Sequence, residues 1–235
     1  MSNKYIGSEL QLFENARNWK SYYGSFLRPY LGKKVAEIGA GLGGTTTALC
    51  SSKQDEWLCV EPDEALIKET ENKINDGQLP SSICKTFCGY SGQLKDKYDS
   101  ILYIDVIEHI ENDSAELQVA SGLLRHGGHL LIIVPAHQFL FSPFDKMIGH
   151  FRRYNKKSLK SALPESVRIK KLYYLDSVGY FASLINKLFL KQKMPTLKQI
   201  QFWDKTLVPL SKIADRLLFF RFGKSLLLIA EKVKD

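Results

Sequence analysis

The sequence has few of the features that mark metal-bound, disulfide-bonded or membrane-spanning proteins. Its 235 residues include only four cysteines, and their irregular spacing at positions 50, 59, 84 and 88 matches neither a zinc motif nor a disulfide framework, so we expect no metal site. The longest mostly apolar stretches, 172–190 and 206–222, are interrupted by residues such as Lys187 and Asp215, and neither can span a bilayer. The first ten residues, MSNKYIGSEL, lack the apolar core of a signal peptide. These absences favour a reduced, cytoplasmic protein.

The net charge of +8 is distributed unevenly along the chain. Residues 1–145 contain 13 Lys and Arg against 19 Asp and Glu, whereas residues 146–235 contain 20 against 6. A basic region of this kind is either a solvated face or a surface for an anionic acceptor, an acidic membrane or nucleic acid.

Strand-length apolar runs alternate with helical patterns through the first 135 residues, which is typical of a parallel sheet covered by helices on both faces. We therefore predict an α/β fold, a Rossmann-like, doubly wound and mostly parallel seven-stranded sheet. The predicted strands are Lys34–Ile38, Glu56–Val60, Ile83–Phe87, Tyr98–Ile104, Gly128–Val134, Val167–Tyr174 and Ser225–Val233. The predicted helices are 8–28, 43–52, 63–75, 113–125 and 158–163, with a shorter piece near 91–95.

The chain reads as one domain over residues 1–235. Residues 30–136 form the expected cofactor-binding core, 137–224 an acceptor-side loop and a mostly helical insert, and 225–233 the last strand. An insert of about fifty residues with its own apolar periodicity is usually a subdomain. Its basic and large apolar residues suit a cap over the substrate, a dimer interface or a peripheral membrane contact, and the sequence does not choose among them.

A glycine-rich turn follows the first predicted strand, in the stretch VAEIGAGLGGTTTALC (35–50). The glycines at 39, 41 and 44 satisfy the dinucleotide-binding pattern, and Glu61 lies where a ribose ligand is expected. Glu37 argues against a dinucleotide, because a carboxylate beside a pyrophosphate costs on the order of several kcal/mol at low local dielectric. With a ligand that has cationic groups and no phosphate, such as S-adenosylmethionine, the electrostatic interaction with this carboxylate becomes favourable.

With these residues in view, the sequence resembles the class I S-adenosylmethionine-dependent methyltransferases. Four landmarks carry the resemblance: Glu37-x-Gly39-x-Gly41-x-Gly43, CVEPD (59–63), YDSILYIDVIEHIEND (98–113) and LLRHGGHLLIIVPA (123–136). It implies that Glu61 chelates the ribose hydroxyls, that Gly39 and Gly41 admit the methionine portion, and that Asp105 and Val106 lie alongside it. The full set of cofactor residues that it implies is Glu37, Gly39, Ala40, Gly41, Gly43, Glu61, Pro62, Gly89, Tyr90, Asp105, Val106 and His109.

The chain departs from the common pattern at the adenine pocket. Many relatives carry an acid just after the third strand, whereas CGYSGQL (88–94) contains neither Asp nor Glu. Backbone groups near Gly89 and Tyr90, or the side chain of Gln93, are the expected substitutes.

The segment VPAHQFLFSPFDKMIGHFRRYNKKSL (134–159) follows the fifth strand, at the edge of the sheet where ligands collect. It resembles a methyltransferase subgroup with a GH-x-R-R-Y segment, which is associated with small-molecule, sugar or lipid-linked acceptors. A histidine is the natural base for an alcohol or amine acceptor. The candidates for catalysis are His137, His150 and His109, and those for acceptor binding are His137, Asp145, His150, Arg152, Arg153 and Tyr154.

Two of these assignments have structural alternatives. The arginines suggest bidentate capture of a phosphate or carboxylate, but an arginine paired with Asp145 would only brace the loop. Trp19, Tyr22 and Tyr23, on the N-terminal helix, serve either as a lid over the cofactor or as core.

The sequence therefore predicts O-methylation of a small or lipid-linked anionic acceptor, with S-adenosylmethionine as cofactor. The alternatives are an RNA methyltransferase, which would use the basic carboxyl-terminal half, and a non-catalytic S-adenosylmethionine-binding partner protein. YIDVIEHI lacks the Asn/Asp-Pro-Pro-aromatic signature of nucleic-acid amino methylases, and nucleic acid is the less favoured partner. A homodimer is compatible with the sequence.

Overall fold

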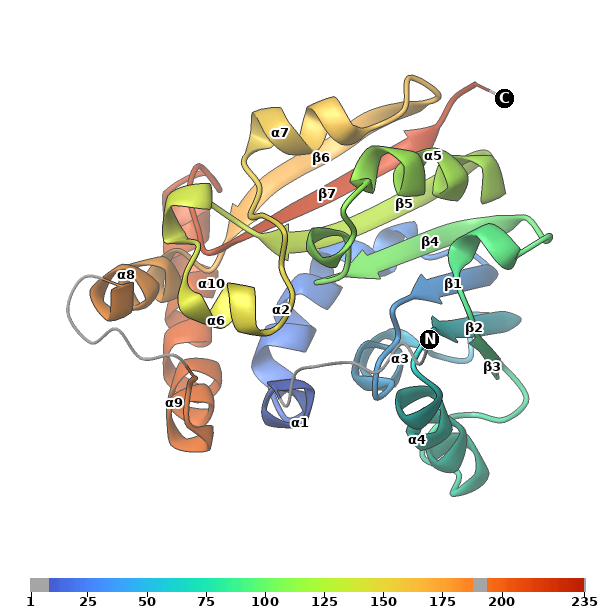
Figure 1. Ribbon diagram of the computed structural model, residues 1–235, viewed down its shortest axis with the longest axis horizontal. Coiled ribbons are helices and arrows are strands. Elements are labelled where there is room, and N and C mark those ends of the chain that lie inside the picture. Colours follow the sequence, from blue (N-terminus) through green and yellow to red (C-terminus); the bar gives the residue numbers. More distant parts are fainter. Residues whose placement is uncertain (1–8, 188–193, 235) are drawn as a thin grey trace.

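A seven-stranded sheet runs through the computed structural model, which describes residues 9–187 and 194–234 (Figure 1). The strand order is β3-β2-β1-β4-β5-β7-β6. Strands β1 to β5 pair in parallel with one another, whereas β7 is antiparallel to both β5 and β6, so the sheet is mixed. The strands are β1 (Lys34–Ile38), β2 (Glu56–Glu61), β3 (Cys84–Cys88), β4 (Tyr98–Ile104), β5 (Leu124–Pro135), β6 (Val167–Leu175) and β7 (Ser225–Lys232).

Alternate residues of the central strands pack into two separate cores, as the period of two in a strand requires. On β5, Leu131 and Ile133 face the layer that contains Trp19 and Trp203. Leu130, Ile132 and Val134 face the opposite layer, which contains side chains of α5 (Asp113–Leu123) and α7 (Lys156–Ala162). Both faces of the sheet are therefore covered, which explains why its central strands are almost continuously apolar.

The helices between the first strands begin where the sequence offers caps. α4 (Glu64–Asn75) starts after Asp63, whose side chain accepts hydrogen bonds from the amides of Ala65 and Leu66. α5 starts after Asn112 in the same way. α3 (Gly44–Leu49) is shorter than the predicted helix over 43–52, and the short 3₁₀ turns are η1 (Arg28–Tyr30), η2 (Ser91–Gln93) and η3 (Ile107–His109).

The single N-terminal helix expected over 8–28 is wrong, because the structure has α1 (Glu9–Glu14) and α2 (Arg17–Leu27). The break has a long-range cause. The carboxylate of Asp204 accepts hydrogen bonds from the backbone amides of Asn18 and Trp19, at 3.2 and 2.9 Å, and so caps the start of α2 from the far end of the chain.

The insert between β6 and β7 contains α8 (Ser177–Ile185), α9 (Leu197–Phe202), a π-helical turn η6 (Trp203–Leu207) and α10 (Val208–Leu217). These helices gather at one end of the sheet (Figure 1). Buried aspartates hold them there: Asp176 accepts hydrogen bonds of 2.7 Å from Trp203 Nε1 and Ser211 Oγ, and Asp215 accepts one of 2.8 Å from Tyr22 Oη on α2. The insert and the N-terminal helices are therefore one packed unit.

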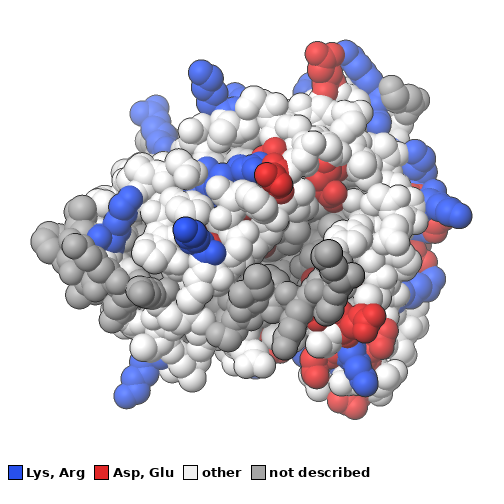
Figure 2. All heavy atoms as spheres, viewed as in Figure 1, with Lys and Arg blue, Asp and Glu red and all other residues white. Residues whose placement is uncertain are grey.

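The acceptor-side segment after β5 forms η4 (Gln138–Leu140) and α6 (Pro143–Met147), and then returns to the sheet through a parallel bridge between Ala136 and Tyr154. Acidic side chains cluster near α4, whose Glu64, Glu69 and Glu71 are exposed, and basic side chains are spread over the rest of this face (Figure 2). Within the described ranges no helix is both long and apolar enough to cross a membrane, and residues 188–190 of the apolar stretch 172–190 lie outside those ranges. All four cysteines are free.

Candidate active site

A cavity of about 690 Å³ lies at the edge of the sheet where β1, β4 and β5 end. This volume is in the usual range for small-molecule sites. The glycine turn, the residues after β4 and the acceptor-side segment form its walls, and α1, α2, α8 and α9 close it. Five of the predicted cofactor residues line it: Gly39, Ala40, Gly41, Asp105 and His109.

The glycine turn follows β1 and uses backbone conformations that favour glycine. Gly39, Gly41 and Gly43 all have positive φ, at +68°, +53° and +72°. A Cβ on Gly39 would lie 2.6 Å from a methyl group of Val106, so a side chain at this position would displace the loop after β4. Val106 therefore packs directly against the turn. Its predicted place beside the cofactor stays a prediction.

Glu61 ends β2 and braces the turn from behind. Its two carboxylate oxygens accept backbone hydrogen bonds from Gly41 and Asp63, at 3.0 and 3.1 Å. Burial raises the pKa of Glu61, although these amide bonds oppose the rise. The carboxylate is thus held in a fixed orientation beside the turn.

Glu37 is placed differently from the expectation of a carboxylate open to the ligand. It is only 2% exposed, and its Oε2 accepts hydrogen bonds from Thr46 Oγ1 at 2.6 Å and Trp57 Nε1 at 2.9 Å. Burial raises its pKa to about 7, and the two hydrogen bonds reduce the shift. Because this carboxyl group carries only part of a charge near neutral pH, the electrostatic selection of a cationic ligand is weaker than the sequence suggested.

Asp105 follows β4 in the left-handed region, with φ +55°. A non-glycine residue there is strained, and such strain clusters at functional sites. Its side chain lines the cavity, and burial among the cavity walls raises its pKa to about 6.

Three titratable side chains meet beyond Asp105, on the acceptor side of the cavity. The rings of His109 and His150 are 4.5 Å apart edge to face, and His150 Nε2 lies 3.8 Å from Glu108 Oε1. Burial raises the pKa of Glu108 well above its ordinary value and lowers that of His109 to about 4. The structure therefore brings together two of the three predicted catalytic histidines.

Asp145 is the buried centre of the acceptor-side segment. Its carboxylate accepts hydrogen bonds from His150 Nδ1, from Nε and Nη2 of Arg153, and from both the amide and the hydroxyl of Ser142. Burial opposes its ionisation, but the bonds from His150 and Arg153 outweigh burial and hold its pKa well below the ordinary range. Arg153 thus braces the loop through its pairing with Asp145, the structural alternative that the sequence left open. The same arginine also lines the cavity.

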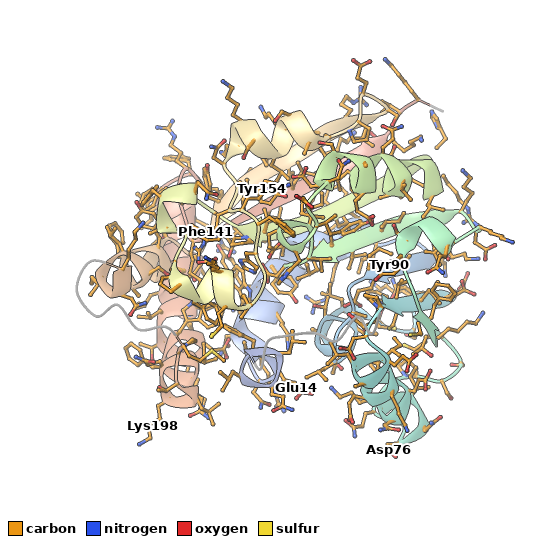
Figure 3. All side chains as sticks on the ribbon, viewed as in Figure 1. Glu14, Asp76, Tyr90, Phe141, Tyr154 and Lys198 are labelled. Carbon is orange, nitrogen blue, oxygen red and sulfur yellow. The ribbon has the colours of Figure 1, made fainter. Side chains whose placement is uncertain are left out.

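Three predicted acceptor residues point elsewhere, and the cavity does not include them. Arg152 pairs with Asp113 at 2.9 Å and donates to the carbonyl of Glu111. Tyr154 is buried and donates a 2.7 Å hydrogen bond to Asp113, its hydroxyl directed toward the start of α5 (Figure 3). The positive φ of His137, +67°, turns its ring away to stack on Tyr174, with centroids 4.9 Å apart. The structure therefore places these three residues outside the cavity, and their roles in acceptor binding stay predictions.

Comparisons with known proteins identify the core of this site. Residues 36–130, which contain the glycine turn, Glu61 and Asp105, match the Methyltransf_12 family model, a methyltransferase domain. Residues 36–130 are a methyltransferase domain. S-adenosylmethionine is its methyl donor, as the sequence predicted, and the chain is an enzyme that transfers methyl groups. No curated protein matches the sequence.

Solved structures support the same fold. Magnesium protoporphyrin IX methyltransferase from Synechocystis PCC 6803, with bound S-adenosylhomocysteine, is 14% identical with a TM-score of 0.61, over 98% of this chain and 89% of that one. An S-adenosylmethionine-dependent methyltransferase from Clostridium acetobutylicum ATCC 824 is 12% identical with a TM-score of 0.61, over 97% and 96%. The [4+2]-cyclase SpnF is 12% identical with a TM-score of 0.62, over 92% and 82%. At these identities the likeness shows the fold, and the acceptor must be argued from the site.

On the expected adenine side, hydrogen bonds within the protein order the turn after β3. The amide of Gly89 donates to the carbonyl of Glu61 at 3.1 Å, and Gln93 accepts from the amide of Tyr90 at 2.7 Å. Tyr90 itself is half exposed. Pro62 lies between Glu61 and the cap of α4. The structure thus orders this turn, while the adenine contacts remain predictions.

The cavity wall also includes Trp19 and Tyr23, which the sequence left as either lid or core, and Glu108 and Lys224, which sequence reasoning missed. Trp19 and Tyr23 of α2 are buried and also line the cavity, so they serve as core and as wall together, whereas Tyr22 is bonded to Asp215. Glu108 and Lys224 line the cavity as well. Glu108 adjoins His109, which offered a local signal. Lys224 precedes β7 about 180 residues after the glycine turn, and nothing near it in the sequence marks a site.

Proposed function

We propose that this methyltransferase transfers a methyl group to an oxygen atom of a small or lipid-linked acceptor that carries a negative charge. One observation carries the proposal: a single cavity joins the glycine turn and Asp105 to His109, His150 and Arg153 on the acceptor side. A donor at the glycine turn and an acceptor beside the histidines would share this space.

The cofactor would lie along the carboxyl ends of β1, β2 and β4. The positive-φ turn from Gly39 to Gly43 leaves room for the methionine portion, and Asp105 offers a carboxylate to its ammonium group. Glu61, already oriented by two amides, would bind the ribose hydroxyls. The adenine would follow toward Gly89 and Tyr90.

The reaction is an in-line displacement. An acceptor oxygen forms a bond to the methyl carbon while the carbon–sulfur bond breaks, and its electron pair stays on sulfur to give S-adenosylhomocysteine. The hydroxyl proton must also leave. Holding the two reactants in line supplies a large part of the rate. His109 and His150 line the same cavity, and either would accept the proton.

The acceptor's negative charge is inferred from a partly buried cation. Lys224 lines the cavity, its Nζ lies 4.2 Å above the Trp203 ring, and the carboxylate of Asp176 is 3.8 Å away. Burial lowers the pKa of Lys224. An acceptor phosphate or carboxylate would compensate this charge better than Asp176 does at that distance.

A lipid-linked acceptor would agree with the outer face of the insert. Leu210, Ile213 and Leu217 of α10 are 50%, 63% and 73% exposed, and they recur at helical spacing beside Lys212 and Arg216. An apolar helix face flanked by cations suits the surface of an anionic membrane, where a lipid carrier is found. Burial of this face in a homodimer is the competing use.

An acceptor screen with labelled S-adenosylmethionine tests the function. We expect label on hydroxyl groups of anionic sugars, lipid-linked phosphates or small acids, and none on neutral analogues. Transfer to RNA alone, or to nitrogen alone, would contradict the proposal. Calorimetry should show S-adenosylhomocysteine binding, no NAD binding, and a sharp loss of affinity in Glu61→Ala, while Glu64→Ala, an exposed neighbour on α4, should bind normally.

A further inference from the structure

Glu108 is a buried carboxyl group without a hydrogen-bond partner. It is fully buried in η3, and neither of its side-chain oxygens has a partner in the described structure. Leaving a buried polar group unsatisfied is costly, and a bare carboxylate more so, so a group of this kind calls for an explanation. Glu108 also lines the cavity, which means that a bound species can reach it.

Two imidazoles lie at the same point. One ligating atom from each of Glu108, His109 and His150 can be chosen so that all three lie within 4.8 Å of one another. His109 adjoins Glu108 on η3, whereas His150 arrives from the acceptor-side segment. Gly149, just before His150, has φ +87°, a backbone conformation that favours glycine, and it lies against His109, since a Cβ on it would be in van der Waals contact with His109 Nδ1 at 3.7 Å.

We propose that Glu108, His109 and His150 bind one divalent transition-metal ion on the acceptor side of the cavity. Two imidazoles and one carboxylate are a common ligand set for Zn²⁺ and Fe²⁺, and they leave coordination positions open. The open positions face the cavity, where the acceptor is expected. The irregular cysteine spacing, from which the sequence predicted no metal, does not bear on a site of this composition.

The geometry needs only small movements. Ligands at about 2.1 Å from an ion cannot be more than about 4.2 Å apart. Two tetrahedral ligands at that distance are about 3.4 Å apart. The Glu108–His150 separation of 3.8 Å is close to this value, and a separation of up to 4.8 Å must shorten by about 1.4 Å, which side-chain rotation can supply. The ion would satisfy the unpartnered oxygens of Glu108.

The surroundings supply a second layer of support. Nδ1 of His150 is hydrogen-bonded to Asp145 at 2.9 Å, which leaves Nε2 directed at the cluster. A carboxylate behind a metal-binding histidine fixes the ring and raises its basicity, and loss of such a partner weakens metal binding by about 10–100-fold. Asp145, Arg153 and Ser142 thus hold one ligand in place.

This inference rests on the proposed function for its consequence. A hydroxyl oxygen of the acceptor would bind the ion through a lone pair, and its pKa would fall. Its proton would pass to water, the oxygen would take the methyl group from sulfur, and the ion would be unchanged. His109 and His150 would then act as ligands, and no free base would be needed.

Equilibrium dialysis with Zn²⁺ or Mn²⁺ alone tests the site. We expect one ion per chain in the unmodified protein and at least a tenfold loss of affinity in Glu108→Gln and His150→Gln. Glu69→Gln and His126→Gln, which remove an exposed carboxylate and an exposed imidazole, are the matched controls and should bind as the unmodified protein does. Absence of stoichiometric metal, or equal binding in the site variants and the controls, would overturn the proposal.

Two further measurements keep the outcomes separate. Binding of S-adenosylhomocysteine, measured by calorimetry, shows whether each variant is folded. If Glu108→Gln does not fold, Co²⁺ is added to the unmodified protein instead. A d–d absorption band that Zn²⁺ abolishes supports the site, and absence of the band refutes the site. Full methyl transfer by chelator-treated, metal-free protein would refute the role of the metal in the reaction and would leave the proposed function intact. Stoichiometric metal binding by a protein that methylates no oxygen acceptor would support the metal site and refute the proposed function.

Discussion

Nδ1 of His150 lies 2.9 Å from Oδ1 of Asp145, five residues earlier in the chain. Because hydrogen bonds hold the pKa of Asp145 well below its ordinary range, this oxygen is an acceptor and Nδ1 is the donor. In the neutral ring Nε2 is then the nitrogen with a free lone pair, and it lies 3.8 Å from Glu108 Oε1. The same carboxylate binds Arg153, so one buried aspartate orients both groups that the acceptor-side segment presents to the cavity.

Replacing Asp145 with Asn should destabilise the protein by about 2–4 kcal/mol. The amide has the size of the carboxylate, but its NH₂ group faces a donor on either side, and Arg153 loses its counter-charge. Urea denaturation measures the change. Asp55→Asn is the control, since its ion pair with Lys33 is exposed and should contribute less than about 1 kcal/mol. Equal losses in the two variants would contradict the central position of Asp145.

Lys224→Gln should raise the KM for an anionic acceptor by about tenfold, which corresponds to ~1.4 kcal/mol, with little change in the KM for S-adenosylmethionine. The reason is the position of this ammonium group in the cavity wall, above Trp203 and away from the glycine turn. Steady-state kinetics in both substrates give the comparison. Lys205→Gln, an exposed lysine on η6, should leave both constants unchanged. Equal effects on both substrates in Lys224→Gln would point to a structural role.

Glu37 should make the unliganded protein less stable as the pH rises from about 4.5 to about 7. Its pKa is about 7 in the folded protein and near 4.5 when unfolded, so the folded state binds the extra proton in this window. The stability present below pH 4.5 is lost through this range, up to about 3 kcal/mol at 1.36 kcal/mol per pH unit.

Glu37→Gln separates that effect from other titrations. Thr46 and Trp57 both donate to the same oxygen of Glu37, and the oxygen of a Gln amide can accept both bonds. We expect unchanged stability near pH 4.5 and a flatter profile up to pH 7, measured by urea denaturation across the range. A variant profile parallel to that of the parent protein would show that Glu37 does not titrate as described.

The strands could be predicted almost to the residue, because long apolar runs bounded by turns are a local signal. β1 and β4 have the predicted bounds, and the other strands differ by a few residues at their ends. The split between α1 and α2 could not be predicted. It depends on Asp204, which caps Trp19 across 185 positions of sequence, and no local pattern contains that partner.

The site divides in the same way. The spacing of Gly39, Gly41 and Glu61 identified the turn, because the turn needs those residues close together in sequence. Arg152 and Arg153 were grouped, yet consecutive residues of an extended segment point to opposite sides, so only Arg153 reaches the cavity. His137 followed the strand as expected, but its positive φ turned it away, and single-residue backbone reversals of this kind have no reliable sequence signal outside glycine.

Gly39→Ala should cost more stability than Gly77→Ala, although both glycines have nearly the same backbone conformation. Their φ angles are +68° and +71°, so an alanine at either position carries about 1–2 kcal/mol of backbone strain. At Gly77 an added Cβ meets nothing within 4 Å, whereas at Gly39 it would lie 2.6 and 2.9 Å from the two methyl groups of Val106. We expect about 1–3 kcal/mol of additional loss from this clash.

The double variant Gly39→Ala/Val106→Ala tests whether the clash is the cause. Removing both methyl groups should restore most of the additional loss relative to Val106→Ala alone, and leave Gly39→Ala near the cost measured at Gly77. Urea denaturation of the four variants gives the stabilities, and calorimetry with S-adenosylhomocysteine reports the turn itself. If the double variant loses the sum of the two single losses, Val106 is not what excludes a side chain from position 39, and the packing of the loop after β4 against the turn has been misjudged.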